Sequence, residues 1–237
     1  MPTSLDIAFA IGFSIAIFAA ELLYFDKRLK ARIAAGASSA RRTAYRYLVV
    51  GEWGLTAIAL LLWARADRPW NVLGLVPPED WRLVPGILVT ALMVAFTIRQ
   101  LRVVQRLGVK QRAALRGRLG GVEFFLPHTP TEHRWFFLLS LTAGFCEELL
   151  YRGFLTWIVA SYAGLPAAIA VVVVAFGLVH VSLGRSGAIR AGLTGLAMSL
   201  IVVLTGWLVP AMIAHALLDI GAGDLSLAVY NDRPVPA

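Results

Sequence analysis

The chain has 237 residues, of which 59% are hydrophobic and only 15% are charged. A water-soluble domain carries about a quarter charged residues, and it cannot bury apolar runs of about twenty residues such as occur here. Runs of this length match the ~30 Å of hydrocarbon that a helix must cross, and in lipid a helix satisfies its own backbone hydrogen bonds. The composition therefore excludes a soluble globular protein and predicts an all-α, polytopic transmembrane helical bundle.

Hydrophobic runs predict about seven membrane spans. They lie near residues 5–25, 47–64, 83–98, 134–160, 165–182, 189–206 and 208–222. The segment 65–82 contains three prolines and is predicted to be a polar loop. The basic segment 99–133 is expected to be partly helical and to lie partly on the membrane surface. The tail from Asp224 is polar, and we expect it to be disordered.

We expect these spans to form one integrated membrane domain with three parts. Residues 1–133 supply three spans and the basic loops, residues 134–222 form a four-helix core, and residues 223–237 form a polar tail. The lone cysteine, Cys146, excludes an internal disulfide and is expected to serve in packing.

The net charge of +8 is concentrated in alternate loops. Only three basic residues fall in the loops of the opposite side, and they are Arg65, Arg68 and Arg82. This is the positive-inside pattern, in which basic loops face the cytoplasm and anionic lipid. It predicts an external N-terminus and a cytoplasmic C-terminus, with the lipid bilayer and no nucleic acid as the partner of the basic residues.

Six ionisable residues in the last four spans mark the candidate site. They are Glu147, Glu148, Arg152, His180, His215 and Asp219. Ionisable groups within the membrane are costly unless they are paired or hydrated, so each is a candidate for function. Two further acids, Glu21 and Glu52, lie near span ends and are expected to reach the membrane interface.

Residue spacing predicts how these groups pair. Glu148 and Arg152 are four residues apart, so on a helix they share a face and can form an ion pair. Glu147 is rotated by ~100° from Glu148 and lacks that partner, which leaves its carboxylate free to act. His215 and Asp219 repeat the four-residue spacing, at which the aspartate can orient the imidazole.

The fourth and fifth spans are predicted to form a hairpin that turns around Gly164 and Pro166. Folding about that point places Glu147 opposite about residue 179, next to His180 and ~24 Å from the outer turn. His215 fits this picture less well, because counting from a turn near residue 207 places it only ~12 Å from the outer end.

A glutamate beside a histidine in a hydrated cavity can activate water. Glu147 would take a proton from a water molecule that His180 helps to position, and His215 could stabilise the oxyanion of a tetrahedral intermediate. Zinc is the alternative, because two histidines and a glutamate make a plausible catalytic ligand set. The sequence contains no HExxH motif, and the three groups lie on separate helices, so we favour a mechanism without metal or other cofactor.

Three motifs follow one another on successive apolar segments: Glu147-Glu148-x-x-x-Arg152, Phe176-x-x-x-His180 and His215-x-x-x-Asp219. Together they resemble the CPBP family, the CAAX-prenyl-protease and bacteriocin-processing intramembrane endopeptidases, also called type II CAAX proteases. The stretch "EELLYRGFL" is close to the family's "EELLFRG" core, and the similarity covers about residues 134–222.

The resemblance implies a role for each motif. Glu147 and His180 would activate water, while Glu148 and Arg152 would hold the electrostatics of the site. His215 and Asp219 would occupy the oxyanion-side motif, in which relatives carry Asn or Asp at the second position. An ionised aspartate cannot donate to an oxyanion, so Asp219 would be protonated or would act by orienting His215.

We therefore predict an intramembrane endopeptidase that cuts a membrane-associated peptide or protein near its C-terminus or leader. The expected location is the plasma membrane, of the bacterial inner-membrane type. The alternative is a non-proteolytic membrane protein on the same scaffold, which acts in immunity to a peptide toxin or in proton-coupled transport.

Overall fold

A computed structural model of the chain describes residues 1–119 and 121–230. All regular secondary structure in these ranges is helical, and six helical segments are long and apolar enough to cross a membrane. One of the six, Pro130–Leu178, contains a non-helical residue, Gly164, with φ 80° and ψ 165°. Because the chain turns back there, this segment supplies two of the seven predicted spans. The predicted all-α, polytopic bundle is confirmed.

The first three spans are built from five elements. These are α1 (Ser4–Ala20), the π-helical η1 (Glu21–Leu29), α2 (Lys30–Ala34), α3 (Ala40–Arg65) and α4 (Leu83–Gln105). The short helix α5 (Val109–Arg118) follows, so the basic segment is partly helical as predicted. The remaining elements are α6 (Pro130–Glu147), the π-helical η2 (Glu148–Leu155), α7 (Thr156–Leu178), the 3₁₀ turn η3 (Val181–Leu183), α8 (Gly184–Thr205) and α9 (Leu208–Tyr230).

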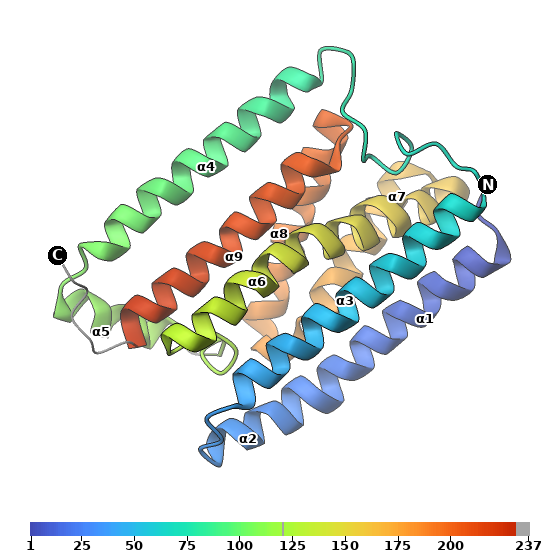
Figure 1. Ribbon diagram of the computed structural model, residues 1–237. Helices are drawn as coiled ribbons and strands as arrows, with labels where there is room; N and C mark the ends of the chain where they lie inside the picture. Colours follow the sequence, from blue (N-terminus) through green and yellow to red (C-terminus); the bar gives the residue numbers. More distant parts are fainter. Residues whose placement is uncertain (120, 231–237) are drawn as a thin grey trace.

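The helices pack in two layers (Figure 1). Helices α9, α6, α3 and α1 lie side by side in that order, with α4 flanking α9. Behind this row, α8 packs against α7 and α9. The N-terminus and the loop 66–82 lie at one end of the bundle, and α2 and α5 lie at the opposite end. The basic segments predicted to share one side of the membrane therefore do lie together.

Local sequence signals explain where α6 begins. The Thr129 hydroxyl accepts a hydrogen bond from the backbone N–H of Glu132 at 3.2 Å, and the Glu132 carboxylate accepts from the backbone N–H groups of Thr129 and His128. This capping box, with Pro130 at the first helical position, starts the helix four residues before the predicted span.

The C-terminal helix is longer than the sequence suggested. Residues 224–230 continue α9 instead of beginning a disordered tail, because their polar side chains have partners at the basic end. The Asp224 carboxylate lies 2.6 Å from Nε2 of His133, and the Ser226 hydroxyl donates to the carbonyl of Pro127 at 2.8 Å. The rest of the predicted disordered tail, residues 231–237, lies outside the described residues.

A glycine lets the neighbouring helices α6 and α9 approach closely. A Cβ atom on Gly144 of α6 would lie 2.7 Å from both the Cβ of Ala216 and the carbonyl oxygen of Met212 on α9. A side chain at residue 144 would therefore push α9 away. This contact brings the histidine of α9 against the glutamates that follow Gly144.

Candidate active site

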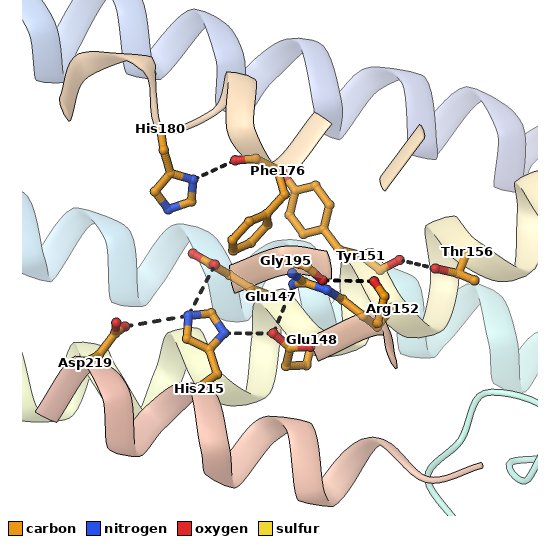
Figure 2. Close-up of polar contacts among 11 residues, drawn as sticks. Glu147, Glu148, Tyr151, Arg152, Thr156, Phe176, His180, Gly195, His215 and Asp219 are labelled. Atoms are coloured by element: carbon orange, nitrogen blue, oxygen red, sulfur yellow. Dashed lines mark hydrogen bonds and ion pairs between the residues drawn. The ribbon is translucent and has the colours of Figure 1, made fainter. Parts of the chain in front are cut away.

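Glu148 is the hub of the buried polar cluster (Figure 2). Its Oε1 atom accepts a hydrogen bond from Nη1 of Arg152 at 2.9 Å and another from Nδ1 of His215 at 2.8 Å. The side chain of Glu148 is fully buried and that of Arg152 is 1% exposed. The ion pair predicted from the four-residue spacing is present, and it also holds a histidine from another helix.

The guanidinium of Arg152 is enclosed by the hairpin partner and by α8. Its central carbon lies 4.1 Å from the centroid of the Phe176 ring, a cation–π contact. A Cβ atom on Gly195 of α8 would lie 2.9 Å from Nη2 of Arg152 and 3.1 Å from the Phe176 ring. Gly195 therefore makes the space that the arginine occupies. The Tyr151 ring also contacts Phe176, with centroids 5.3 Å apart, so the predicted hairpin around Gly164 is confirmed.

Glu147 differs from its neighbour in that no described residue donates a hydrogen bond to its carboxylate, whereas Oε1 of Glu148 accepts two. The Oε2 atom of Glu147 has no hydrogen-bond partner within the described part of the chain, and its side chain is 20% exposed. The same atom lies 3.9 Å from Nε2 of His215, which is too far for a hydrogen bond. As predicted, Glu148 is paired with Arg152 and Glu147 is not.

The second site histidine, His180, lies two residues after the end of α7, directly before η3. Its Nδ1 lies 2.7 Å from the carbonyl oxygen of Phe176, and a carbonyl can only accept, so Nδ1 carries the hydrogen. In the neutral ring Nε2 is then the unprotonated acceptor. Among the described residues, no hydrogen bond or ion pair joins His180 to Glu147. The expected partnership of these two groups would therefore need a water molecule between them.

His215 lies deeper than the residue count predicted. The backbone N–H of Leu208, where α9 begins, donates to the carbonyl of Gly74 at 2.8 Å. A Cβ atom on Gly153 would lie 3.1 Å from the side chain of Leu73 and 3.2 Å from that of Leu208. Helix α9 thus starts beside Gly153 and not beside the turn at Gly164. The loop 66–82 reaches into the bundle at this level and contacts the start of α9. The estimate failed because it assumed that both turns lie at one level.

The free nitrogen of His215 lies between two accessible carboxylates. Its Nε2 atom is 3.9 Å from Oε2 of Glu147 and 3.7 Å from Oδ2 of Asp219, and Figure 2 shows the ring between these side chains. The Asp219 side chain is 39% exposed. Glu148 fixes the ring through its other nitrogen, so Nε2 is the atom left to interact with a bound molecule.

Residues 129–221 match the model of the type II CAAX prenyl endopeptidase Rce1-like family. The match confirms the predicted resemblance, and it contains all six ionisable residues. It covers less than half of the chain, and the first three spans lie outside it. Comparison with curated proteins and with solved structures finds no match. The matched segment 129–221 is called the Rce1-like core below.

Two acids outside the Rce1-like core are buried, contrary to the expectation that they reach the interface. Glu21 of η1 and Glu52 of α3 are each 9% exposed. Glu21 is hydrogen-bonded to the backbone N–H and the hydroxyl of Ser182, and Oε2 of Glu52 has no hydrogen-bond partner among the residues described. The signal that could have found them is the cost of an acid within an apolar span. Because both residues lie near the ends of predicted spans, we expected them to reach the interface and did not treat them as site candidates.

The zinc alternative requires three ligands around one point. No three His, Cys, Asp or Glu side chains of residues 1–119 and 121–230 converge in this way. Nδ1 of each site histidine is engaged, in His180 by the Phe176 carbonyl and in His215 by Glu148, so Nε2 is the nitrogen of each ring that remains open. The described side chains as placed do not form a three-ligand zinc site, and the choice of a mechanism without metal stays a prediction.

Proposed function

We propose that the chain is an intramembrane endopeptidase in which Glu147 is the general base. The observation that carries this proposal is the contrast between adjacent glutamates: Glu148 accepts hydrogen bonds from Arg152 and His215, while the carboxylate of Glu147, beside His215, accepts none from the described residues. A charge network that only holds the helices together would need Glu148 but not Glu147. The membership of the Rce1-like core in a protease family supports the same reading.

The proposed reaction is hydrolysis of a peptide bond by one water molecule. Glu147 takes a proton from the water, whose oxygen attacks the carbonyl carbon of the substrate. The Nε2 atom of His180 accepts the second hydrogen of this water and orients it. The carbonyl π electrons move to the substrate oxygen, which becomes an oxyanion. When the C–N bond breaks, the proton held by Glu147 passes to the leaving amine.

His215 is the proposed donor to the oxyanion. As an imidazolium cation it donates through both nitrogens, through Nδ1 to Glu148 and through Nε2 to the developing negative charge. Asp219, whose carboxylate lies 3.7 Å from Nε2, would orient the ring. No metal or other cofactor takes part in this proposal.

The proposed substrate is a membrane-associated peptide or protein cut near its C-terminus or leader. The family description points to a prenylated C-terminal CAAX sequence. The end of the bundle that carries α2 and α5 is rich in Lys and Arg, so we place it in the cytoplasm and the N-terminus outside. We propose that the chain is an integral protein of the plasma membrane in this orientation.

The test is cleavage by the purified protein in detergent. A farnesylated peptide that ends in a CAAX sequence, and the same peptide without the prenyl group, are incubated with wild type and with the Glu147→Gln and His180→Ala variants. We expect mass spectrometry to detect C-terminal fragments with wild type alone. Comparing the C-termini of the membrane proteome with and without the gene identifies natural substrates. Cleavage by Glu147→Gln at the wild-type rate would contradict the role of Glu147 as the base. If Glu147→Gln replaced the wild-type gene in cells without loss of its cellular function, the non-proteolytic alternative would be favoured.

A further inference from the structure

The loop that carries His180 is hydrogen-bonded to the C-terminal part of the first span, in η1 and α2. The backbone N–H of Ser182 donates to Oε1 of Glu21 at 3.3 Å, and the Ser182 hydroxyl donates a short hydrogen bond to the same oxygen. The Lys30 ammonium donates to the Ser182 carbonyl oxygen at 2.7 Å. One residue of the loop is thus held through its N–H, its hydroxyl and its carbonyl by two side chains of a distant segment.

His180 itself lies in the turn between α7 and α8, where its backbone N–H donates to the Gly177 carbonyl and its own carbonyl accepts from Leu183. Helix α7 ends before it, its own backbone is non-helical with φ −118° and ψ 16°, and the short turn η3 follows. After η3 the backbone of Gly184 adopts φ +79°, a conformation that favours glycine. Within this link, Ser182 is 3% exposed and is the polar residue that is anchored to another helix. Fixing Ser182 therefore fixes the direction from which His180 enters the site.

The geometry points to Glu21 as a positioning residue for His180. Glu21 is buried at the start of the π-helical turn η1, where it faces η3, and it lies outside the Rce1-like core. An acid at this place is costly in an apolar span unless it has partners, and both hydrogen bonds from Ser182 go to the same carboxylate oxygen. The first span would thereby be part of the catalytic machinery and not only a membrane anchor. This inference rests on the proposed function for its catalytic consequence, but its structural part stands without it.

The test compares Glu21→Met, which keeps the volume and removes the acceptors, with Glu21→Gln, which keeps an acceptor oxygen. Histidine labelled with ¹⁵N reports the ring tautomer of His180 by NMR in detergent micelles, and the His180→Gln variant assigns its signals. We expect wild type and Glu21→Gln to show hydrogen at Nδ1, and Glu21→Met to show mixed tautomers. Glu79→Ala, at an exposed glutamate of the loop at the opposite end, is the matched control and should leave the spectrum unchanged.

Cleavage of the farnesylated CAAX peptide provides the second measurement. We expect Glu21→Met to lower kcat by about ten- to a hundredfold with KM nearly unchanged, because a misplacement of ~1 Å can cost about 10²-fold. Glu21→Gln should restore most of kcat. If Glu21→Met does not fold, Ser182→Ala replaces it, and its His180 spectrum should change in the same direction.

A folded Glu21→Met protein with the wild-type His180 spectrum would overturn the inference, as would an unchanged spectrum of Ser182→Ala where that variant is needed. The NMR measurement requires no substrate. If wild type fails to cleave the peptide, the proposed function is in question while the role of Glu21 is still decided.

Discussion

The Nδ1 atom of His215 lies 2.8 Å from Oε1 of Glu148, although the two residues are 67 positions apart in the chain. This hydrogen bond joins α9 to η2, and it shares its acceptor with Arg152. It fixes which nitrogen of His215 remains available. In the proposed function, the fully buried Glu148 holds the structure and the partly exposed Glu147 acts as the base.

Exchanging each glutamate for glutamine should separate these two roles. We expect Glu147→Gln to lower kcat/KM for the farnesylated peptide by about 10²–10⁴-fold, with a thermal unfolding midpoint close to that of wild type. Glu148→Gln should lower both the midpoint and the activity, because the glutamine weakens two charge-assisted hydrogen bonds. Equal loss of stability in both variants would contradict this division.

The buried ion pair predicts a stability difference between single and double variants. Arg152→Met leaves the Glu148 charge with His215 as its only remaining partner in the site, and breaking a buried pair costs about 3–5 kcal/mol. The double variant Glu148→Met/Arg152→Met removes both charges and should be more stable than Arg152→Met alone. Thermal unfolding in detergent measures the difference, and a double variant less stable than Arg152→Met would sink the prediction.

Gly195 should not tolerate even a methyl group. We expect Gly195→Ala to lower stability by about 1–3 kcal/mol and to reduce activity, because the new Cβ would meet the guanidinium of Arg152 at 2.9 Å. The control is Gly54→Ala in α3, where a Cβ would have nothing within 4 Å. Alanine there should be neutral or stabilise the helix by up to about 1 kcal/mol. The two unfolding midpoints test the prediction, and a wild-type midpoint for Gly195→Ala would contradict it.

Chelators should leave the proposed activity unchanged. If Glu147 activates water without a metal, cleavage of the peptide should continue at the same rate after treatment with EDTA or 1,10-phenanthroline. Metal content measured by mass spectrometry on the same sample gives an independent check. Inhibition by the chelator that added Zn²⁺ reverses would show that the metal-free mechanism is wrong.

His128 in the loop before α6 should make stability depend on pH. Its ring stacks on that of Tyr230, with centroids 3.9 Å apart, and burial together with the nearby charge of Arg41 lowers the pKa of His128. The unfolded chain then takes up a proton first, so this group contributes stability above about pH 6.5 that is lost as the pH falls. The drop in unfolding midpoint between pH 7.5 and pH 5.5 should be smaller in His128→Phe than in wild type. An equal drop would rule this out.

Several features of the fold could be read from the sequence because they depend on local physics. Apolar runs of membrane length predicted the spans. Gly164, between two such runs, predicted the position of the hairpin, and its backbone is non-helical in the structure. The four-residue spacing of Glu148 and Arg152 gave their ion pair, because residues at that spacing share one helical face. The order of the three motifs indicated the family whose model matches residues 129–221.

The tertiary structure decided which groups meet across the spans. That His215 bonds Glu148, that Gly195 makes room for Arg152, and that Glu21 holds Ser182 all depend on how deep each helix begins and how closely two helices pack. Neither quantity is a property of a single span. The loop 66–82 is the clearest example, because its hydrogen bond to Leu208 sets the depth at which α9 begins. Contacts between segments distant in the chain leave no periodic signal in the sequence.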